Sequence, residues 1–200
     1  FGIEPFLPII RHVRDRFPAL WLGVNFLAVT GRDAFPVLGM LQSTGTNVDA
    51  YWADDARIDE SRATSDQGEA RAILAAKAAA GWHGFYTGGT CFKKQREVPA
   101  DMHETAARIA ADYMDAVCTS GVATGQAVDL GKIKTFRRAI GDVPLLVASG
   151  ITPENAGAYA GDVDGFMVAT GINRPGDFYN IEPARLADLM KLAVQQGAKT

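Results

Sequence analysis

The sequence predicts an α/β fold, and within that class a (β/α)8 barrel of the TIM type. Short apolar runs alternate with longer segments in which apolar residues recur every three or four positions, the order expected of strands and helices in a parallel array. The short runs are apolar on both faces, as parallel strands covered by helices tend to be. Two consecutive runs end in a small residue followed by glycine, at 149–150 and 170–171, which suits the phosphate-binding loops of such barrels.

Six runs are expected to form strands, and each is followed by a helical pattern. The expected strands are 20–28, 48–53, 83–87, 116–119, 145–148 and 165–169. The expected helices are an opening helix at 5–16 and then 33–41, 68–80, 102–112, 130–140, 153–160 and 183–195. Pro153 and Pro183 begin the last two, because proline at the first helical position already has the required φ.

The number of expected strands falls short of the eight that close a TIM barrel. An open flavodoxin-like sheet would tolerate six strands, but here the first expected strand is preceded by a helix. We therefore expect about the first two strands of the barrel to be missing from this chain. Residues 1–200 would then form a single, incomplete barrel domain with an exposed edge at 20–28.

The composition fits a compact protein and excludes several kinds of partner. The 200 residues are 48% hydrophobic and carry a formal net charge of -3, with no basic run typical of nucleic-acid binding. Cys91 and Cys118 have no CxxC partner or neighbouring histidine cluster, so neither a disulfide framework nor a zinc site is expected. No apolar run reaches the ~20 residues that span a bilayer. We expect a cytoplasmic protein without a transmembrane segment or a nucleic-acid partner.

The small-residue and glycine turns predict a phosphate site. Glycine lets backbone amides approach an anion, and a helix that begins behind the turn adds a favourable field. The candidate phosphate ligands are Ser149, Gly150 and Gly171, with Gly121, Thr124 and Gly125 in the loop after the fourth expected strand. The other interpretation is that these glycines only shape tight turns.

Candidate catalytic residues follow the second and third expected strands. Asp54 and Asp55 lie just past a strand end, where carboxylates could move protons or hold Mg²⁺ beside a substrate phosphate. No other cofactor is expected, and the alternative is a solvated acidic loop. Lys93 could pair with a phosphate or form a Schiff base, or it could lie in an exposed turn.

Catalysis in a TIM barrel occurs at the carboxyl ends of the strands, so residues there form the candidate substrate pocket. The pocket candidates are Asn25, Thr87, Thr119, Ser120 and Thr170.

Several segments carry a resemblance to a known family. They are FGIEPF at 1–6, LGVNFL at 22–27, SDQG at 65–68, TSGVATGQAVDLGKI at 119–133, and SGITPEN at 149–155 with DGFMVATGI after it. On these segments the chain resembles the BtpA/SgcQ family, which belongs with the ribulose-phosphate-binding barrels. The resemblance implies a phosphate-binding barrel in which the FG…PF segment follows the second strand.

The chain departs from that family at the expected mouth of the barrel. In GGTCFKKQ, Gly89 and Lys94 stand where relatives tend to have Asp and His. Asn173 stands where a lysine is common. Both departures affect the residues available for shared chemistry.

Two functions from different classes remain open. The first is an enzyme of isomerase, lyase or transferase type that acts on a small phosphorylated metabolite, such as a sugar phosphate or phosphoribosyl compound. The second is a non-catalytic biogenesis or assembly factor for a membrane protein complex, since fold alone does not decide function. An open parallel edge would also favour a homo-oligomer.

Overall fold

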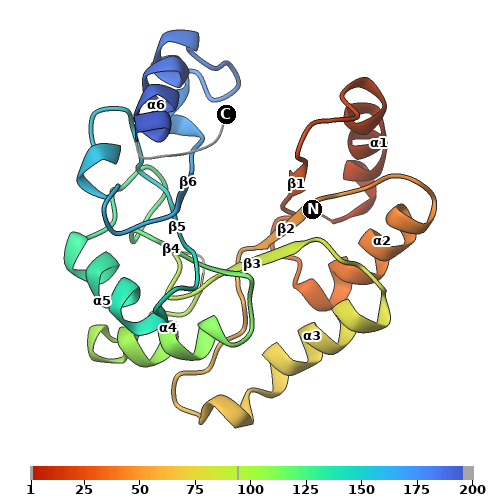
Figure 1. The fold of residues 1–200 in the computed structure, drawn as a ribbon, viewed down its shortest axis with the longest axis horizontal. Helices are drawn as coiled ribbons and strands as arrows, with labels where there is room; N and C mark the ends of the chain where they lie inside the picture. The colour runs from red at the N-terminus through yellow and green to blue at the C-terminus, as the bar shows by residue number, and fades with distance from the viewer. Residues whose placement is uncertain (1, 94, 196–200) are drawn as a thin grey trace.

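The computed structural model describes residues 2–93 and 95–195, and its six strands form one sheet (Figure 1). The strands are β1 (Gly23–Val24), β2 (Ala50–Ala53), β3 (Phe85–Gly89), β4 (Ala116–Ser120), β5 (Leu145–Ala148) and β6 (Gly165–Met167). They pair in chain order, and every pairing is parallel. Consecutive parallel pairing is the arrangement of a TIM barrel, so the predicted α/β fold of TIM type is confirmed.

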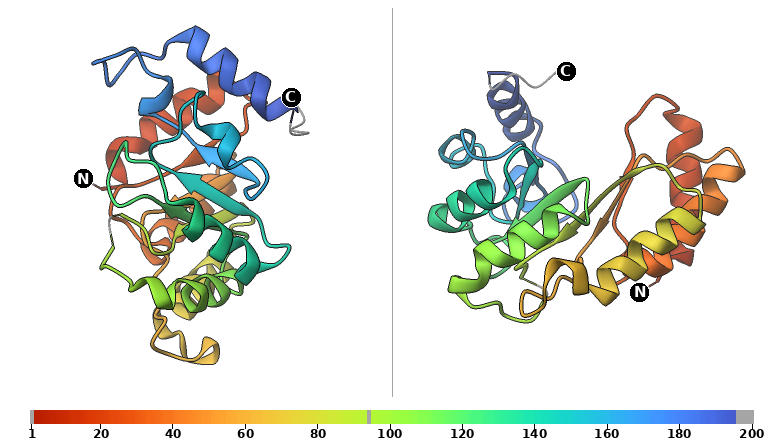
Figure 2. Two further views of the ribbon diagram at one scale, coloured as in Figure 1. Left: turned by 90° about the vertical axis from the view of Figure 1, so that its left-hand side faces the viewer. Right: turned by 60° about the horizontal axis from the view of Figure 1, so that its bottom comes forward.

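The sheet curls into a half-barrel whose convex side is covered by helices (Figures 1 and 2). The helices are α1 (Leu7–Arg16), α2 (Gly31–Ser43), α3 (Gly68–Ala79), α4 (His103–Ala111), α5 (Leu130–Ile140) and α6 (Pro183–Gln195). Short 3₁₀ turns lie at Glu4–Phe6, Thr64–Asp66, Ala100–Met102, Ala156–Ala158 and Thr170–Ile172. The half-barrel opens between α1 and α6 (Figure 1). None of the helices in the described ranges is long and apolar enough to cross a membrane.

The main core lies between the sheet and the outer helices and is built on aromatic side chains. Phe35 of α2 stacks on Trp82 with ring centroids 5.2 Å apart. It also contacts Tyr51 and Tyr86 edge-on, at 5.7 and 5.1 Å. The Trp82 indole donates a hydrogen bond to the Val48 carbonyl at 3.1 Å, so its buried N–H is satisfied. These contacts fix α2 against β2 and β3.

A smaller apolar cluster covers the concave face. It consists of Phe92, Cys118 and Ala148, with Trp52, Leu146 and Met167 packed against them. Leu145 and Val147 belong instead to the main core, because successive residues of a strand point to opposite faces. The concave cluster is therefore the part of the barrel interior that these six strands supply.

The first strand is much shorter than the predicted 20–28. After Val24 the chain leaves the sheet: the Asn25 side chain donates to the Trp52 carbonyl at 2.7 Å, and Ala28 adopts a φ of 61°. The apolar pattern predicted too long a strand. Among the described strands β1 pairs with β2 alone, so few backbone hydrogen bonds hold its residues in the sheet. Within the described residues, nothing pairs with the outer side of β1 or of β6, so β1 is an edge strand as expected.

The predicted helix at 153–160 is wrong. Only a 3₁₀ turn forms there, at Ala156–Ala158. The Asn155 side chain accepts from the Thr152 amide at 2.8 Å and donates to the Gly150 carbonyl at 2.7 Å. This side chain bonds the preceding turn and so competes with helix formation. The loop after β5 therefore lacks the helix N-terminus that the phosphate prediction included.

Candidate functional site

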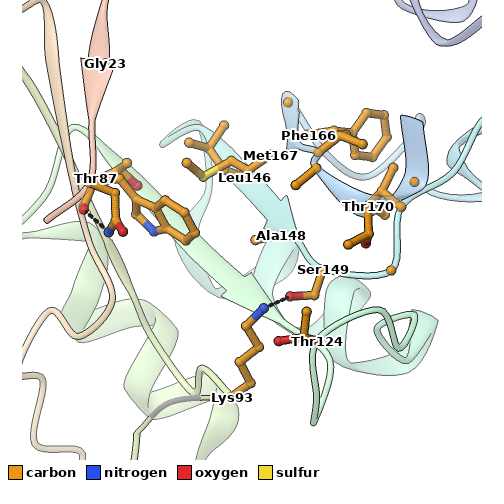
Figure 3. A pocket seen from close by; sticks show the side chains of 18 of the residues that line it. Gly23, Thr87, Lys93, Thr124, Leu146, Ala148, Ser149, Phe166, Met167 and Thr170 are labelled. Carbon is orange, nitrogen blue, oxygen red and sulfur yellow. Dashed lines mark hydrogen bonds between the residues drawn. The ribbon is translucent and has the colours of Figure 1, made fainter. Parts of the chain in front are cut away.

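The concave side of the half-barrel holds a cavity of about 720 Å³ (Figure 3). Along the strands its walls are apolar and include Trp52, Leu146, Phe166 and Met167. Beyond the carboxyl ends of the strands the lining becomes polar. The polar end consists of Lys93, Thr124, Ser149 and Thr170 with Gly125, Gly150 and Gly171. Among the lining residues of the described ranges, Lys93 is the one charged side chain. The cavity thus combines an apolar body with a positively charged end.

Lys93 and Ser149 meet at the polar end of this cavity. The Lys93 Nζ donates to the Ser149 Oγ at 2.6 Å, although 56 positions separate the two residues in the chain. Figure 3 shows the lysine side chain extending from the loop after β3 toward the loop after β5. The backbone amide of Lys93 is fixed as well, because it donates to the Ser120 Oγ at 3.0 Å. The ammonium is therefore held at a defined place in the cavity.

The loop after β5 has an uncommon backbone conformation. Ser149 has a φ of 73° and Gly150 a φ of 66°, so two successive residues are left-handed. The left-handed region costs a non-glycine residue about 1–2 kcal/mol. Such strained residues cluster at ligand sites, where the surrounding structure holds them.

Glycine at positions 150 and 171 is required by close backbone approach. A Cβ on Gly150 would collide with the backbone of Gln126 and Ala127 in the loop after β4. A Cβ on Gly171 would collide with the Ile151 carbonyl oxygen. The loops after β4, β5 and β6 are therefore in direct backbone contact, and these glycines allow that contact whether or not a ligand binds.

The structure brings most of the predicted site residues together. Those that line the cavity are Asn25, Thr87, Lys93, Thr124, Gly125, Ser149, Gly150, Thr170 and Gly171. Ser120 and Gly121 line a neighbouring cavity of about 770 Å³, between the loop after β3 and the loop after β4. Thr119 is fully buried. Asp54 and Asp55 belong to neither lining.

Asp54 is a buried residue that supports the β1–α2 connection. Its Oδ2 accepts from the Ala28 amide at 3.1 Å, and its Oδ1 lies 3.5 Å from the Asn25 Nδ2. Ala28 is a left-handed residue in the connection between β1 and α2, so the carboxylate stabilises a strained turn.

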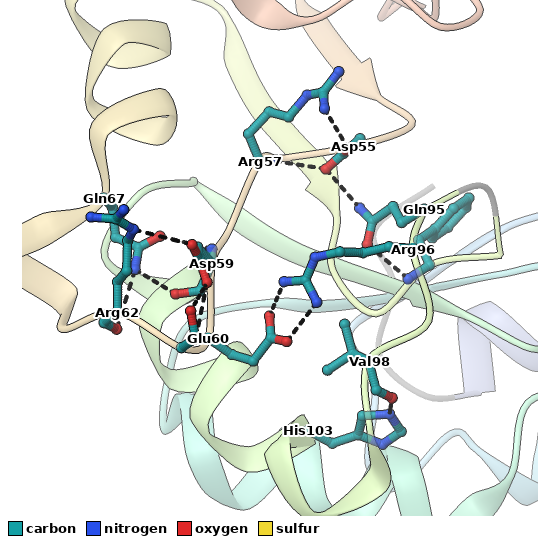
Figure 4. A network of polar contacts seen from close by, with 12 residues as sticks. Asp55, Arg57, Asp59, Glu60, Arg62, Gln67, Gln95, Arg96, Val98 and His103 are labelled. Carbon is teal, nitrogen blue, oxygen red and sulfur yellow. Dashed lines mark hydrogen bonds and ion pairs between the residues drawn. The ribbon is translucent and has the colours of Figure 1, made fainter.

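Asp55 belongs to a polar network on the outer side of the loops (Figure 4). Its Oδ1 accepts from the Arg57 amide at 2.8 Å and from the Gln95 Nε2 at 3.1 Å. In the same network the buried Glu60 forms a bidentate ion pair with Arg96. The Arg96 Nη1 donates to the Glu60 Oε1 at 2.7 Å, and the Nη2 donates to the Oε2. Within the described ranges, no group of three or more Asp, Glu, His or Cys side chains is arranged to hold a metal ion.

The Glu60–Arg96 pair gives a pH-dependent stability. The hydrogen bond from Arg96 holds the pKa of Glu60 below its ordinary value of 4.5. This stabilisation is present above pH 4.5 and is lost as the pH falls through the lowered pKa. We expect Glu60→Gln to lower the free energy of unfolding at pH 7, because it removes the charge that pairs with Arg96. The loss should be limited to about 1–2 kcal/mol, since Arg96 is partly exposed and solvent screens the pair. Urea unfolding at pH 7 and pH 3 measures the effect, and the difference from the parent chain should shrink at pH 3.

The control for this prediction is an exposed ion pair of the same region. Asp66 and Arg62 pair at 2.8 Å on the surface. Asp66→Asn should leave the free energy of unfolding nearly unchanged, because solvent screens this exposed pair. A loss for Asp66→Asn as large as that for Glu60→Gln would contradict the role of burial.

Gly89, where the resemblance led us to expect a departure from relatives, lies in a crowded part of the backbone. A Cβ there would collide with the Asp54 carbonyl oxygen and with the Phe92 side chain, so this backbone leaves no room for an aspartate. The Gln95 amide instead bonds the Gly89 carbonyl and Asp55. Lys94 lies outside the described residues.

Two residues that sequence reasoning did not select border the site. Phe178, in the segment after β6, also lines the cavity, and no local pattern marks it. Lys132 lies in the first turn of α5, three residues after the capping residue Asp129. A lysine is unfavourable at that end of a helix, and this signal could have drawn attention to it.

Comparisons with known proteins identify one family and one fold. A model described as the BtpA family matches residues 93–195. An uncharacterized protein of Pyrococcus horikoshii is 41% identical over 81 residues, which are 38% of this chain and 31% of that protein. The putative sgc region protein SgcQ of Escherichia coli is 28% identical over 81 residues, which are 40% of this chain and 30% of that protein. The matched segment thus spans about a third of these curated relatives.

A solved structure supports the fold alone. Phosphoribosyl anthranilate isomerase from Thermococcus kodakaraensis superposes with a TM-score of 0.59 over 92% of this chain and 80% of its own. The two sequences are 14% identical, so the likeness concerns the fold.

Proposed function

The chain belongs to the BtpA family, and we propose that it binds the phosphate group of a small phosphorylated metabolite at the polar end of the concave cavity. The observation that carries this proposal is the contact of the Lys93 Nζ with the Ser149 Oγ at 2.6 Å. It joins a cation from the loop after β3 to a hydroxyl from the loop after β5. These are loops at the carboxyl ends of parallel strands, where barrels of this type bind ligands.

The donor set at this end matches a phosphate. Lysine binds phosphate as a compact charge, and hydroxyl groups donate further hydrogen bonds. Thr124 and Thr170 add two hydroxyls to that of Ser149 around the same cavity. Lys93 would be the main attraction, with the hydroxyls and the glycine-rich backbone setting orientation. We propose a sugar phosphate or a phosphoribosyl compound as the ligand class, and a reaction of isomerase, lyase or transferase type.

Two variants of Ser149 test this site. Ser149→Ala and Ser149→Gly both remove the hydroxyl that contacts Lys93, so both should weaken phosphate binding by about 3- to 10-fold. The glycine variant should be about 1 kcal/mol more stable than the alanine variant, because alanine keeps the strained φ of 73°. Titration with inorganic phosphate and ribose 5-phosphate, followed by tryptophan fluorescence, measures affinity, since Trp21 and Trp52 line the cavity. Unchanged affinity in both variants would remove Ser149 from the site.

A non-catalytic role is the second candidate, and the position of the carboxylates favours it. Asp54 and Asp55 hold backbone amides outside the cavity and so do not reach a ligand there. In that case the barrel would serve as a biogenesis or assembly factor that keeps its phosphate loops. Phosphorus NMR of a sugar-phosphate mixture separates the two: binding that depends on Lys93, without conversion of any bound compound, supports the non-catalytic role.

We further propose that two additional parallel strands close the barrel between β6 and β1. Both outer edges carry backbone groups available for pairing, and Trp52, Leu146 and Met167 on the concave face are only partly buried. In a closed barrel such side chains are packed from all sides. Hydrogen exchange tests this proposal, because the amides of β1 and β6 should exchange much more slowly in a form that carries the additional strands.

A further inference from the structure

Lys132 occupies a position that disfavours a cation. It is in the first turn of α5, three residues after the cap Asp129, whose Oδ1 accepts from the Lys132 amide at 2.9 Å. The N-terminus of a helix carries a partial positive charge, so a lysine there is repelled. Burial of the ammonium adds a second cost and lowers the pKa of Lys132. Because the helix N-terminus and burial both destabilise the Lys132 ammonium, other contacts must compensate for them.

The compensating contacts are two backbone carbonyls, one from a loop and one from the end of a strand. The Lys132 Nζ donates to the Cys91 carbonyl at 2.6 Å and to the Ser120 carbonyl at 2.9 Å. Cys91 lies in the loop after β3, and Ser120 is the last residue of β4. The ammonium therefore ties these two segments together.

Both carbonyls belong to the segments that fix Lys93. Cys91 is two residues before Lys93 and has a left-handed φ of 49°, a conformation that needs support. The Ser120 Oγ accepts from the Lys93 amide at 3.0 Å. Lys132 thus bonds the two residues that position the Lys93 backbone: Cys91, which precedes it in the loop, and Ser120, whose hydroxyl binds its amide. From there the Lys93 Nζ reaches Ser149 at 2.6 Å.

We infer that Lys132 is a positioning residue for the phosphate site: its ammonium clamps Cys91 and Ser120 so that Lys93 is aimed at Ser149. This inference rests on the phosphate site proposed above. Lys132 lines the neighbouring cavity of about 770 Å³ and does not line the cavity that contains Ser149, whereas Lys93 lines both. Lys132 therefore acts on a bound phosphate through Lys93 and not by touching it.

A double-mutant cycle on the 200-residue chain tests this indirect action. The four proteins are the parent chain, Lys93→Met, Lys132→Met and the double variant, each titrated with inorganic phosphate. We expect Lys132→Met alone to weaken phosphate binding by about 5-fold, and to change it by less than about 2-fold when Lys93 is already methionine. Lys134→Met, which removes an exposed lysine of the same helix, controls for net charge and should leave affinity unchanged.

The outcomes separate this inference from the phosphate site itself. If Lys132→Met binds phosphate as the parent does, or weakens binding equally in both backgrounds, the inference is overturned and the phosphate site stands. If the parent chain binds no phosphate, the site fails first and the inference falls with it.

A second variant covers the case in which Lys132→Met does not fold. Ser120→Ala removes the hydroxyl that accepts from the Lys93 amide and leaves the helix unchanged. It should weaken phosphate binding in the parent chain and have no further effect in the Lys93→Met background. Equal losses in both backgrounds would show that this segment does not act through Lys93.

Discussion

Gly171→Ala is expected to lower the free energy of unfolding by about 2–3 kcal/mol, the cost of forcing an extra carbon into a packed interior. The added Cβ would meet the Ile151 carbonyl oxygen, which belongs to the backbone and cannot rotate away as a side chain can. The loop after β6 is also held by Arg185, whose Nε donates to the Gly171 carbonyl at 2.8 Å. A backbone shift that relieves the collision would move the Gly171 carbonyl and so break its hydrogen bond with Arg185. For a chain of this size the melting temperature should fall by about 5–10 °C.

Two other glycines provide controls of graded effect. Gly125 has a φ of 79° with open space where its Cβ would be, so Gly125→Ala should cost only the conformational strain, about 1 kcal/mol. Gly161 has neither a positive φ nor a close neighbour, so Gly161→Ala should stay within about 0.5 kcal/mol. Thermal unfolding of the three variants should rank them in this order. A Gly171→Ala variant as stable as Gly161→Ala would show that the β5 and β6 loops are not in backbone contact.

The positions of most strands and helices along the chain could be predicted from the sequence, because they depend on local patterns of apolar residues. Runs such as 145–148 are apolar at every position, and both β5 and α5 have the bounds that the pattern predicted. The errors lie where one contact outweighed the pattern. Asn25 turned the chain out of the sheet after β1, and Asn155 replaced a predicted helix by a turn. A single polar side chain that bonds the backbone leaves little trace in hydrophobic periodicity.

The candidate site was predicted in its position but not in its contacts. The rule that function lies at strand carboxyl ends selected Lys93, Ser149 and Asp54 alike. The structure separates them, since Lys93 and Ser149 share one cavity and Asp54 is turned toward the Ala28 amide. Side chains that follow a strand by one residue can point to either side of the loop, and the strand pattern does not decide between them.

The position of the Lys93 ammonium implies a strong dependence of phosphate affinity on its charge. Among the lining residues of the described ranges it is the one charged side chain, so no second cation of that lining compensates for its loss. A hydrogen bond to a charged group contributes about 1.5–3 kcal/mol, which corresponds to roughly 10- to 100-fold in affinity. Charge attraction near a surface is also screened by salt.

Lys93→Met is therefore expected to weaken binding of inorganic phosphate by about 10- to 100-fold while lowering stability by less than about 1 kcal/mol. Methionine keeps an unbranched apolar stem like that of lysine and lacks only the terminal ammonium, so the variant removes the charge with little change in packing. Affinity of the parent chain should fall as salt rises from 50 to 300 mM, and this dependence should become shallow in Lys93→Met. Calorimetric titration at both salt concentrations measures the two effects, with Lys134→Met as the matched control. If Lys93→Met kept the parent affinity and salt dependence, phosphate would have to bind elsewhere on the chain, and the cavity on the concave side would lose its assignment.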